Sequence, residues 1–212
     1  MTAIINDQDL EQELIRERQR LGHDLRDEVW DGVYVISPFP ANPHQRIVGY
    51  LDTIFRLVVD FKGRGVVLPG ANISDREDDW KQNYRVPDCC VFLNGSKARD
   101  LDTHWLGGPD FCVEIASPGE RVEEKLPFYA SVGTREILLV LRSPRRLKLM
   151  RLDGTDLVVV GESTGESPTW LESAIVPLAF RITGTSQARV IEVRRTDEPG
   201  EWTIPLSFTF GQ

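Results

Sequence analysis

The sequence predicts an α/β fold in which a mixed β-sheet is flanked by helices. Three observations support this prediction: an amphipathic helical segment around residue 50, several short apolar runs of β type after it, and a second helical segment between the last two of those runs. Helices and strands in this order bury their apolar faces by packing the helices on the sheet. With 212 residues, the chain fits one compact domain with appended elements.

The composition is that of an ordinary globular protein. Charged residues make up 27% of the chain and hydrophobic residues 41%, which excludes a disordered or collagen-like polypeptide. No apolar run approaches the ~18 residues that a membrane span requires, and the N-terminus lacks the apolar core of a signal peptide. We therefore expect a cytoplasmic protein with no membrane partner.

The first expected element is an exposed amphipathic helix over residues 7–21 that ends at Gly22. We assign residues 1–24 to this N-terminal helical appendage. A β-hairpin over residues 29–36 follows, and Asp31-Gly32 supplies its turn. The leucines that stand among the charged residues of the helix are Leu10, Leu14 and Leu21.

The next helix is predicted from Asn42 to about residue 59. Asn42, Pro43 and Gln45 form a capping-box pattern with a proline at the first helical position. Gly63 stands where a glycine after the helix is expected. The apolar residues that repeat at helical spacing, and so should face the core, are Ile47, Leu51, Ile54, Phe55, Val58 and Val59.

Four apolar runs of β type come next. The second and the fourth are almost continuously apolar, which is typical of strands that are covered on both faces. In order, the runs are Val66–Leu68, Val86–Leu93, Phe111–Ala116 and Ile137–Leu141.

A second helix should lie between the last two strands. Ser117, Pro118 and Glu120 provide an N-cap, a proline and an N3 glutamate. Pro127 should kink this helix, and Gly133 should end it. Its apolar residues are Val122, Leu126, Tyr129 and Ala130.

The remaining elements are β-strands. Residues 147–160 alternate as a hairpin around Asp153-Gly154, and residues 175–193 are typical of further strands. We assign residues 25–160 to a core domain and residues 161–212 to a C-terminal β extension.

Two carboxylates interrupt the buried strands. Asp88 opens the apolar part of the second run, and Glu114 lies inside the third. An uncompensated carboxylate in such a sheet costs several kcal/mol, so each must be protonated, paired with a cation or bound to a metal. Glu114 shares its strand face with Cys112 and Ala116. If the two strands are neighbours, both carboxylates can reach one cation.

The ligand chemistry favours Mg²⁺ or Mn²⁺ over zinc, because hard oxygen donors occur without a cluster of histidines or cysteines. The three histidines have no partner at metal-ligand spacing, and the three cysteines lack a C-x-x-C pattern and are expected to be buried. The structural alternative is that Asp88 caps a loop and that Glu114 pairs with an arginine such as Arg142.

An ordered set of motifs between Glu28 and Leu152 resembles the Uma-type restriction endonucleases, which belong to the PD-(D/E)XK nuclease superfamily. Each motif alone is unspecific, but their order along the chain is specific. The motifs are Glu28-Val29-Trp30-Asp31-Gly32, His44-Gln45-Arg46-Ile47-Val48, Arg85-Val86-Pro87-Asp88, Val113-Glu114-Ile115-Ala116-Ser117-Pro118, Lys125 with Phe128-Tyr129, and Gly133-Thr134-Arg135-Glu136.

The resemblance implies a restriction-endonuclease-like core and a metal-dependent phosphodiester hydrolase, most directly a DNA endonuclease. Asp88, Glu114 and the main-chain carbonyl of Ile115 would bind Mg²⁺ or Mn²⁺, and Lys125 would stabilise the charge of the transition state or position the hydroxide. Glu28 would be an outer metal ligand or a structural residue. Whether the protein forms a homodimer is left open.

The position of the lysine departs from the superfamily pattern. Ala116 stands two residues after the glutamate, where the D/E-x-K lysine belongs, and Lys125 is the first lysine downstream. The Uma-type family is similar in carrying its lysine at such a displaced site. The alternative is that Lys125 pairs with Glu123 or Glu124 at the surface.

The charge distribution keeps a second function class open. A net charge of −8 and a pI near 5.0 argue against a protein that coats nucleic acid. Residues 1–31 carry nine acidic and four basic side chains, whereas residues 120–151 carry eight basic and four acidic ones. That basic stretch is either a phosphate-contacting edge or a solvated hairpin. The rival to an enzyme is therefore an idle nuclease-like module that binds nucleic acid or a partner protein.

Overall fold

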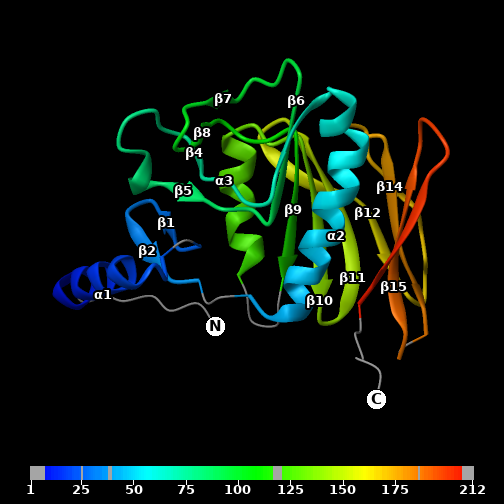
Figure 1. Cartoon of the computed structure of the whole chain (residues 1–212), viewed down its shortest axis with the longest axis horizontal. Helices are drawn as coiled ribbons and strands as arrows, with labels where there is room; N and C mark the ends of the chain where they lie inside the picture. Colours follow the sequence, from blue (N-terminus) through cyan, green and yellow to red (C-terminus); the bar gives the residue numbers. More distant parts are fainter. Residues whose placement is uncertain (1–7, 25, 38–39, 117–120, 186, 207–212) are drawn as a thin grey trace.

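The protein is built around a six-stranded mixed sheet with a helix on each face (Figure 1). This computed structural model describes residues 8–24, 26–37, 40–116, 121–185 and 187–206. β9 and β10 of the central sheet run parallel and its other neighbours antiparallel, which confirms the predicted α/β class. From edge to edge the strands are β12 (Asp156–Thr164), β11 (Arg145–Asp153), β10 (Glu136–Arg142), β9 (Phe111–Ala116), β6 (Cys89–Leu93) and β3 (Gly65–Leu68).

One face of the central sheet packs against α2 (Asn42–Val58) and a C-terminal sheet. The rings of Phe55, Phe111 and Phe180 meet in this core, with centroids 5.3 to 6.2 Å apart. The C-terminal strands therefore share one hydrophobic core with α2 and the central sheet. In sheet order they are β13 (Leu171–Glu172), β14 (Leu178–Gly184), β15 (Arg189–Arg195) and β16 (Glu201–Pro205).

The other face of the central sheet packs against α3 (Leu126–Ser131) and residues of a second, irregular sheet. Tyr129 of α3, Cys112 of β9 and Ile73 are completely buried in this second core. Four strands of the second sheet have only two residues, too few to show an alternating pattern in the sequence. In order the strands are β2 (Val33–Val35), β1 (Glu28–Trp30), β5 (Tyr84–Arg85), β4 (Ile73–Ser74), β8 (Trp105–Leu106) and β7 (Arg99–Asp100).

Helix α2 buries all six of its predicted core residues, but its ends differ from the prediction. The N-cap residue is Ala41, whose methyl group cannot cap a helix, so the capping box predicted at Asn42 is wrong. Pro43 lies in the first turn, where its missing N–H breaks no helical hydrogen bond. Gly63 ends a short 3₁₀ turn over Asp60–Lys62, with φ = 65°, a conformation that favours glycine.

The segment after β9 is a 3₁₀ turn, η3 (Val122–Lys125), followed directly by α3. The predicted cap residues, Ser117 and Glu120, lie outside the described residues. Pro127 stands in the first turn of α3. The predicted kink at Pro127 is wrong, because a proline in the first turn removes no intrahelical hydrogen bond.

The predicted strands agree with the structure more closely than the predicted helix ends do. β9 spans the predicted residues, β3 and β10 are slightly longer than predicted, and β6 begins at Cys89 instead of Val86. The β1–β2 turn contains Asp31 and Gly32 with φ of 49° and 85°. β11 and β12 form the hairpin predicted around Asp153.

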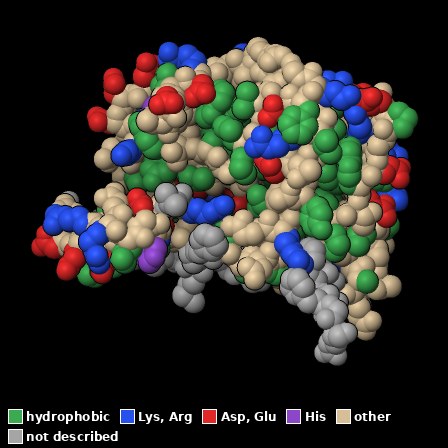
Figure 2. All heavy atoms as spheres, in the orientation of Figure 1, with side chains coloured by type: hydrophobic (Ala, Val, Ile, Leu, Met, Phe, Trp, Pro, Cys, Tyr) green, Lys and Arg blue, Asp and Glu red, His purple; other side chains and the backbone are tan. Residues whose placement is uncertain are grey.

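Helix α1 (Gln8–Leu21) stands away from the body of the protein, and its visible surface is rich in charged side chains (Figures 1 and 2). Asp27, which is almost completely buried, attaches it. The Asp27 carboxylate accepts hydrogen bonds from Arg18 of α1 at 2.5 Å, from the Tyr34 hydroxyl at 2.6 Å and from the Ser37 N–H at 2.8 Å. Within the described ranges, no helix is long and apolar enough to cross a membrane.

Asp27→Asn should destabilise the protein and release α1. The buried amide cannot replace the ionised acceptor of Arg18, so we expect a loss of about 2 to 3 kcal/mol in urea unfolding. Trypsin should also cleave α1 of the variant faster. Glu17→Gln is the matched control, because Glu17 forms only an exposed ion pair with Arg20. A wild-type unfolding midpoint and proteolysis rate for Asp27→Asn would contradict this account of the attachment.

Candidate active site

The two carboxylates that interrupt the buried runs lie on adjacent strands. β6 and β9 are antiparallel neighbours, and Cys89 pairs with Val113. Extending this register by one residue places Asp88 opposite Glu114, and the N–H of Asp88 donates to the Val113 carbonyl at 3.1 Å. Phe111, Val113 and Ile115 of β9 face the α2 core and Cys112 and Ala116 the α3 core. The expected strand neighbourhood and the expected face of Glu114 are both confirmed.

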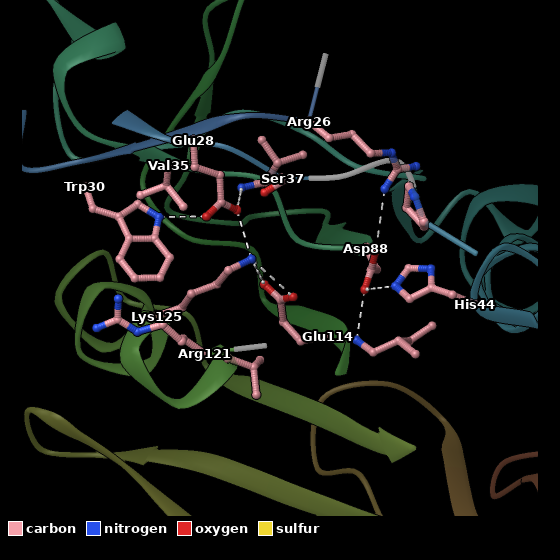
Figure 3. A pocket seen from close by; sticks show the side chains of 14 residues that line it. Arg26, Glu28, Trp30, Val35, Ser37, His44, Asp88, Glu114, Arg121 and Lys125 are labelled. Atoms are coloured by element: carbon pink, nitrogen blue, oxygen red, sulfur yellow. Dashed lines mark hydrogen bonds and ion pairs between the residues drawn. The ribbon is translucent and has the colours of Figure 1, made fainter. Parts of the chain in front are cut away.

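A cavity of about 80 Å³ lies where the two sheets meet near the first turn of α2. The structure brings all the predicted site residues to its wall, Ile115 included (Figure 3). Of the basic stretch 120–151, Arg121 and Lys125 line the cavity, whereas none of the described lining residues comes from 142–151. Arg146 and Lys148 pair with Glu162 on β12, so the solvated-hairpin interpretation fits the second half of the stretch only. The lining residues used below are Arg26, Glu28, Trp30, Ser37, His44, Val86, Asp88, Glu114, Ile115 and Lys125.

Asp88 is held by groups from three elements and is 8% exposed. Its Oδ2 accepts the N–H of Ile115 at 2.8 Å and lies 3.2 Å from Nε2 of His44. Its Oδ1 lies 3.6 Å from a guanidinium nitrogen of Arg26. The side chain thus continues the β6–β9 ladder by accepting a main-chain N–H of strand β9, not by capping a loop as the structural alternative expected, and it also faces the cavity.

Glu114 is buried beside a lysine. Lys125 Nζ lies 3.2 Å and 3.4 Å from its two oxygens, and the Tyr129 hydroxyl donates to Oε1 at 2.5 Å. Burial raises the pKa of Glu114 to about 7; the ammonium of Lys125 opposes this rise, and the negative charge of Asp88 adds to it. The structural alternative predicted that Glu114 pairs with an arginine. Its partner is instead Lys125.

Lys125 joins two carboxylates. Its Nζ donates to Glu28 Oε1 at 2.8 Å as well as to Glu114, and the side chain is 17% exposed. Burial disfavours the charged ammonium, but the carboxylates of Glu114 and Glu28 outweigh it and raise the pKa of Lys125. Surface pairing with Glu123 or Glu124 is therefore wrong. Lys125 turns inward because η3 runs along the edge of the cavity.

Glu28 has hydrogen bonds at both carboxylate oxygens. Oε1 accepts the N–H of Val86 and the ammonium of Lys125, each at 2.8 Å, and Oε2 accepts Nε1 of Trp30 at 2.7 Å. The Arg85 guanidinium supports this tryptophan, since it lies 4.9 Å from the Trp30 ring and 4.3 Å from the ring of Phe128. These hydrogen bonds fix Glu28 in position. Of the two roles that the sequence left open, outer metal ligand or structural residue, they favour the structural one.

Sequence reasoning missed three residues of this site. The sequence indicates no partner for His44. In the structure, His44 is buried in the first turn of α2 and contacts Asp88. Tyr129 appears in the motif Lys125 with Phe128-Tyr129, but no role in the site was predicted for it; its four-residue spacing from Lys125 could have placed both on one helical face. Arg26 gave no signal in the sequence, because its segment precedes β1 and is irregular.

The donor set fits a hard divalent cation. Asp88 and Glu114 offer carboxylate oxygens from neighbouring strands, and Mg²⁺ is commonly held by one or two carboxylates together with water. In the part of the chain that the structure describes, no three His, Cys, Asp or Glu side chains are grouped closely enough to hold a metal. A cation here would keep part of its water shell, which suits Mg²⁺ or Mn²⁺ better than zinc.

Comparisons with known proteins identify the fold and the family of the chain. A solved structure, described as a putative nuclease belonging to DUF820 from Anabaena variabilis ATCC 29413, matches with a TM-score of 0.53 and 19% sequence identity, over 68% of this chain and 79% of that chain. This likeness supports the restriction-endonuclease-like fold. No curated protein matches the chain. The family model Uma2, described as "Putative restriction endonuclease", matches residues 11–183, and the chain therefore belongs to the Uma2 family.

Proposed function

We propose that the protein is a metal-dependent phosphodiester hydrolase, an endonuclease that acts on DNA. The observation that carries this proposal is the convergence of Asp88, Glu114 and Lys125, from three segments of the chain, on one cavity. Burying two carboxylates and an ammonium costs free energy that apolar side chains would avoid. A chemical role therefore explains these residues better than packing does. Membership of the Uma2 family supports the same class of reaction.

Asp88, Glu114 and the main-chain carbonyl of Ile115 are the groups that would hold Mg²⁺ or Mn²⁺. Ile115 and His44 already occupy Oδ2 of Asp88, whereas Oδ1 has the longer, 3.6 Å contact with Arg26 and is the oxygen that would bind a cation. When bound, the cation supplies Lewis acidity and lowers the pKa of a water molecule. His44 and the Ile115 N–H keep the Asp88 carboxylate in one orientation.

Lys125 would meet the negative charge that develops on the phosphate. Its ammonium already lies beside Glu114, so a phosphate bound next to that carboxylate comes within its reach. Glu28 would hold Lys125 in place. As an outer metal ligand, Glu28 would have to give up a hydrogen bond to Trp30, Val86 or Lys125.

Cleavage of supercoiled plasmid DNA with Mg²⁺ or Mn²⁺ tests the proposal. An endonuclease nicks or linearises the plasmid only when the cation is present, and EDTA stops the reaction. The rival, an idle nuclease-like module, predicts retained binding of nucleic acid or a partner protein without cleavage under either cation.

Glu114→Gln should abolish metal-stimulated cleavage, with a loss of at least about 10²-fold. The amide keeps an oxygen for the Tyr129 hydroxyl but removes one of the two carboxylates beside the buried Lys125 ammonium. Because Glu28 still pairs with that ammonium, the metal-free variant should unfold at only a modestly lower temperature than the wild type. Gel-based cleavage rates and thermal melts measure the two effects. Glu123→Gln, at an exposed position of η3, is the control and should cut normally. A large drop in melting temperature for Glu114→Gln would support a purely structural pair.

Lys125→Ala should lower single-turnover cleavage by about 10²-fold, the order expected for removal of one preorganised charge. The stabilisation by Mn²⁺ should change little, because an ammonium is not a metal ligand. Lys125→Arg should restore only part of the rate, since a planar guanidinium presents its charge differently. Lys62→Ala, at an exposed lysine, serves as control. Cleavage by Lys125→Ala at the wild-type rate would show that another cation acts on the phosphate.

The effect of Mn²⁺ on stability should grow as the pH rises through about 7. Burial raises the pKa of Glu114 from 4.5 to about 7, so a proton competes with the cation below that pH. Without metal, the protonated group stabilises the fold at low pH, and this contribution is lost between pH 4.5 and about 7. Melting temperatures at about pH 5.5 and about pH 8 should therefore differ strongly in their Mn²⁺ response. For Glu114→Gln, Mn²⁺ should raise the melting temperature only weakly at either pH. If Mn²⁺ raised the melting temperature of the wild type equally at the two pH values, the competition between proton and cation at Glu114 would be refuted.

A further inference from the structure

A second cavity, of about 650 Å³, lies beside the candidate active site. One side is formed by the end of α1 and the turn that follows it, and the other by the loop between β3 and β4. Arg26, Ser37 and Val86 line both cavities, so the two are adjacent. The proposed reaction uses only the smaller cavity. The larger one has the volume of a small-ligand site.

The second cavity is lined by basic side chains in a chain that is acidic overall. The chain has 33 acidic and 25 basic residues, yet the ten described lining residues contain Arg18, His23 and Arg26 and no carboxylate. The Arg18 guanidinium is bound to the buried carboxylate of Asp27. Arg26 and His23 are therefore the side chains that a ligand would meet.

Arg26 stands at the junction of the two cavities. Its guanidinium nitrogen lies 3.6 Å from Oδ1 of Asp88, too far for a hydrogen bond, and the side chain is 28% exposed. The guanidinium can therefore bind an anion without breaking a short contact. The planar donor pattern of arginine fits phosphate and carboxylate groups.

The opposite wall is formed by Pro69, Gly70, Ala71 and Asn72, whose side chains are small or short. Gly70 has φ = 85°, which favours glycine and lets the main chain itself form part of the surface. The ten described lining residues include no Phe, Tyr or Trp ring on which a base could stack. A nucleic acid here would be bound through its backbone rather than its bases.

We infer that this second cavity holds one unpaired strand of nucleic acid beside the phosphate that is cut, with Arg26 and His23 on its backbone phosphates. The inference rests on the proposed function of the neighbouring site. A cavity lined by basic side chains next to the candidate active site can bind a polyanion whose chain continues beside that site, and a small-ligand volume admits a nucleotide but not a base-paired duplex. The substrates would therefore carry a single-stranded segment next to the cleavage point.

Fluorescence anisotropy in EDTA tests the inference without requiring cleavage. The probes are a labelled single strand of about 15 nucleotides and a blunt duplex of equal length. The single strand should bind at least about tenfold more tightly, and Arg26→Ala should weaken it about tenfold. Arg26→Ala should also reduce the slope of log K against log salt by about 0.7, the value for one phosphate contact on a single strand.

Arg20→Ala is the matched control, because Arg20 on α1 is exposed and does not line the cavity; it should leave affinity within about twofold. His23→Ala, in the turn after α1, provides a second variant should Arg26→Ala unfold. Tighter binding of the duplex, or equal effects of Arg26→Ala and Arg20→Ala, would overturn the inference. Plasmid cleavage is measured separately. If the protein cuts plasmid DNA but binds the duplex more tightly, only the assignment of the second cavity is refuted. If it binds single strands but does not cut, only the proposed nuclease activity is refuted.

Discussion

The site depends on the ammonium of Lys125, which is buried between Glu114 and Glu28. Two buried carboxylates so close together would repel each other and lose their hydration, and the intervening ammonium offsets part of that cost. The lysine in turn keeps its charge because of those carboxylates. This contact joins η3 to a strand of each sheet. The same ion pair therefore holds three segments of the chain together and sets the charge of the site.

The rest of the structure places groups around this ion pair. Alternation along β9 turns Glu114 away from the α2 core, and the register with β6 brings Asp88 opposite it. The first turn of α2 contributes His44, which contacts Asp88. Behind Glu28, the stacked Trp30, Arg85 and Phe128 side chains provide a rigid backing. An acidic protein thereby concentrates three carboxylates and one ammonium in a single cavity.

Much of this could be predicted from the sequence, because two buried carboxylates in apolar strands violate a simple rule and so attract attention. Strand alternation was enough to assign the face of Glu114, and the displaced lysine followed from Ala116. The orientation of Lys125 could not be predicted, since the surface alternative with Glu123 or Glu124 had the same local pattern. The contacts of Arg26 and His44 depend on how distant segments pack together, which no periodicity encodes. The cap of α2 was mispredicted because Asn42 is a good capping residue that tertiary packing placed one position inside the helix.

The central claim is that Asp88 and Glu114 jointly bind a catalytic cation. Anomalous diffraction from a crystal soaked in Mn²⁺ tests it most directly. The account predicts a manganese peak in the smaller cavity, about 2.1 Å from a carboxylate oxygen of each residue, with waters completing the coordination. An absent peak, or one that contacts neither carboxylate, would contradict the claim.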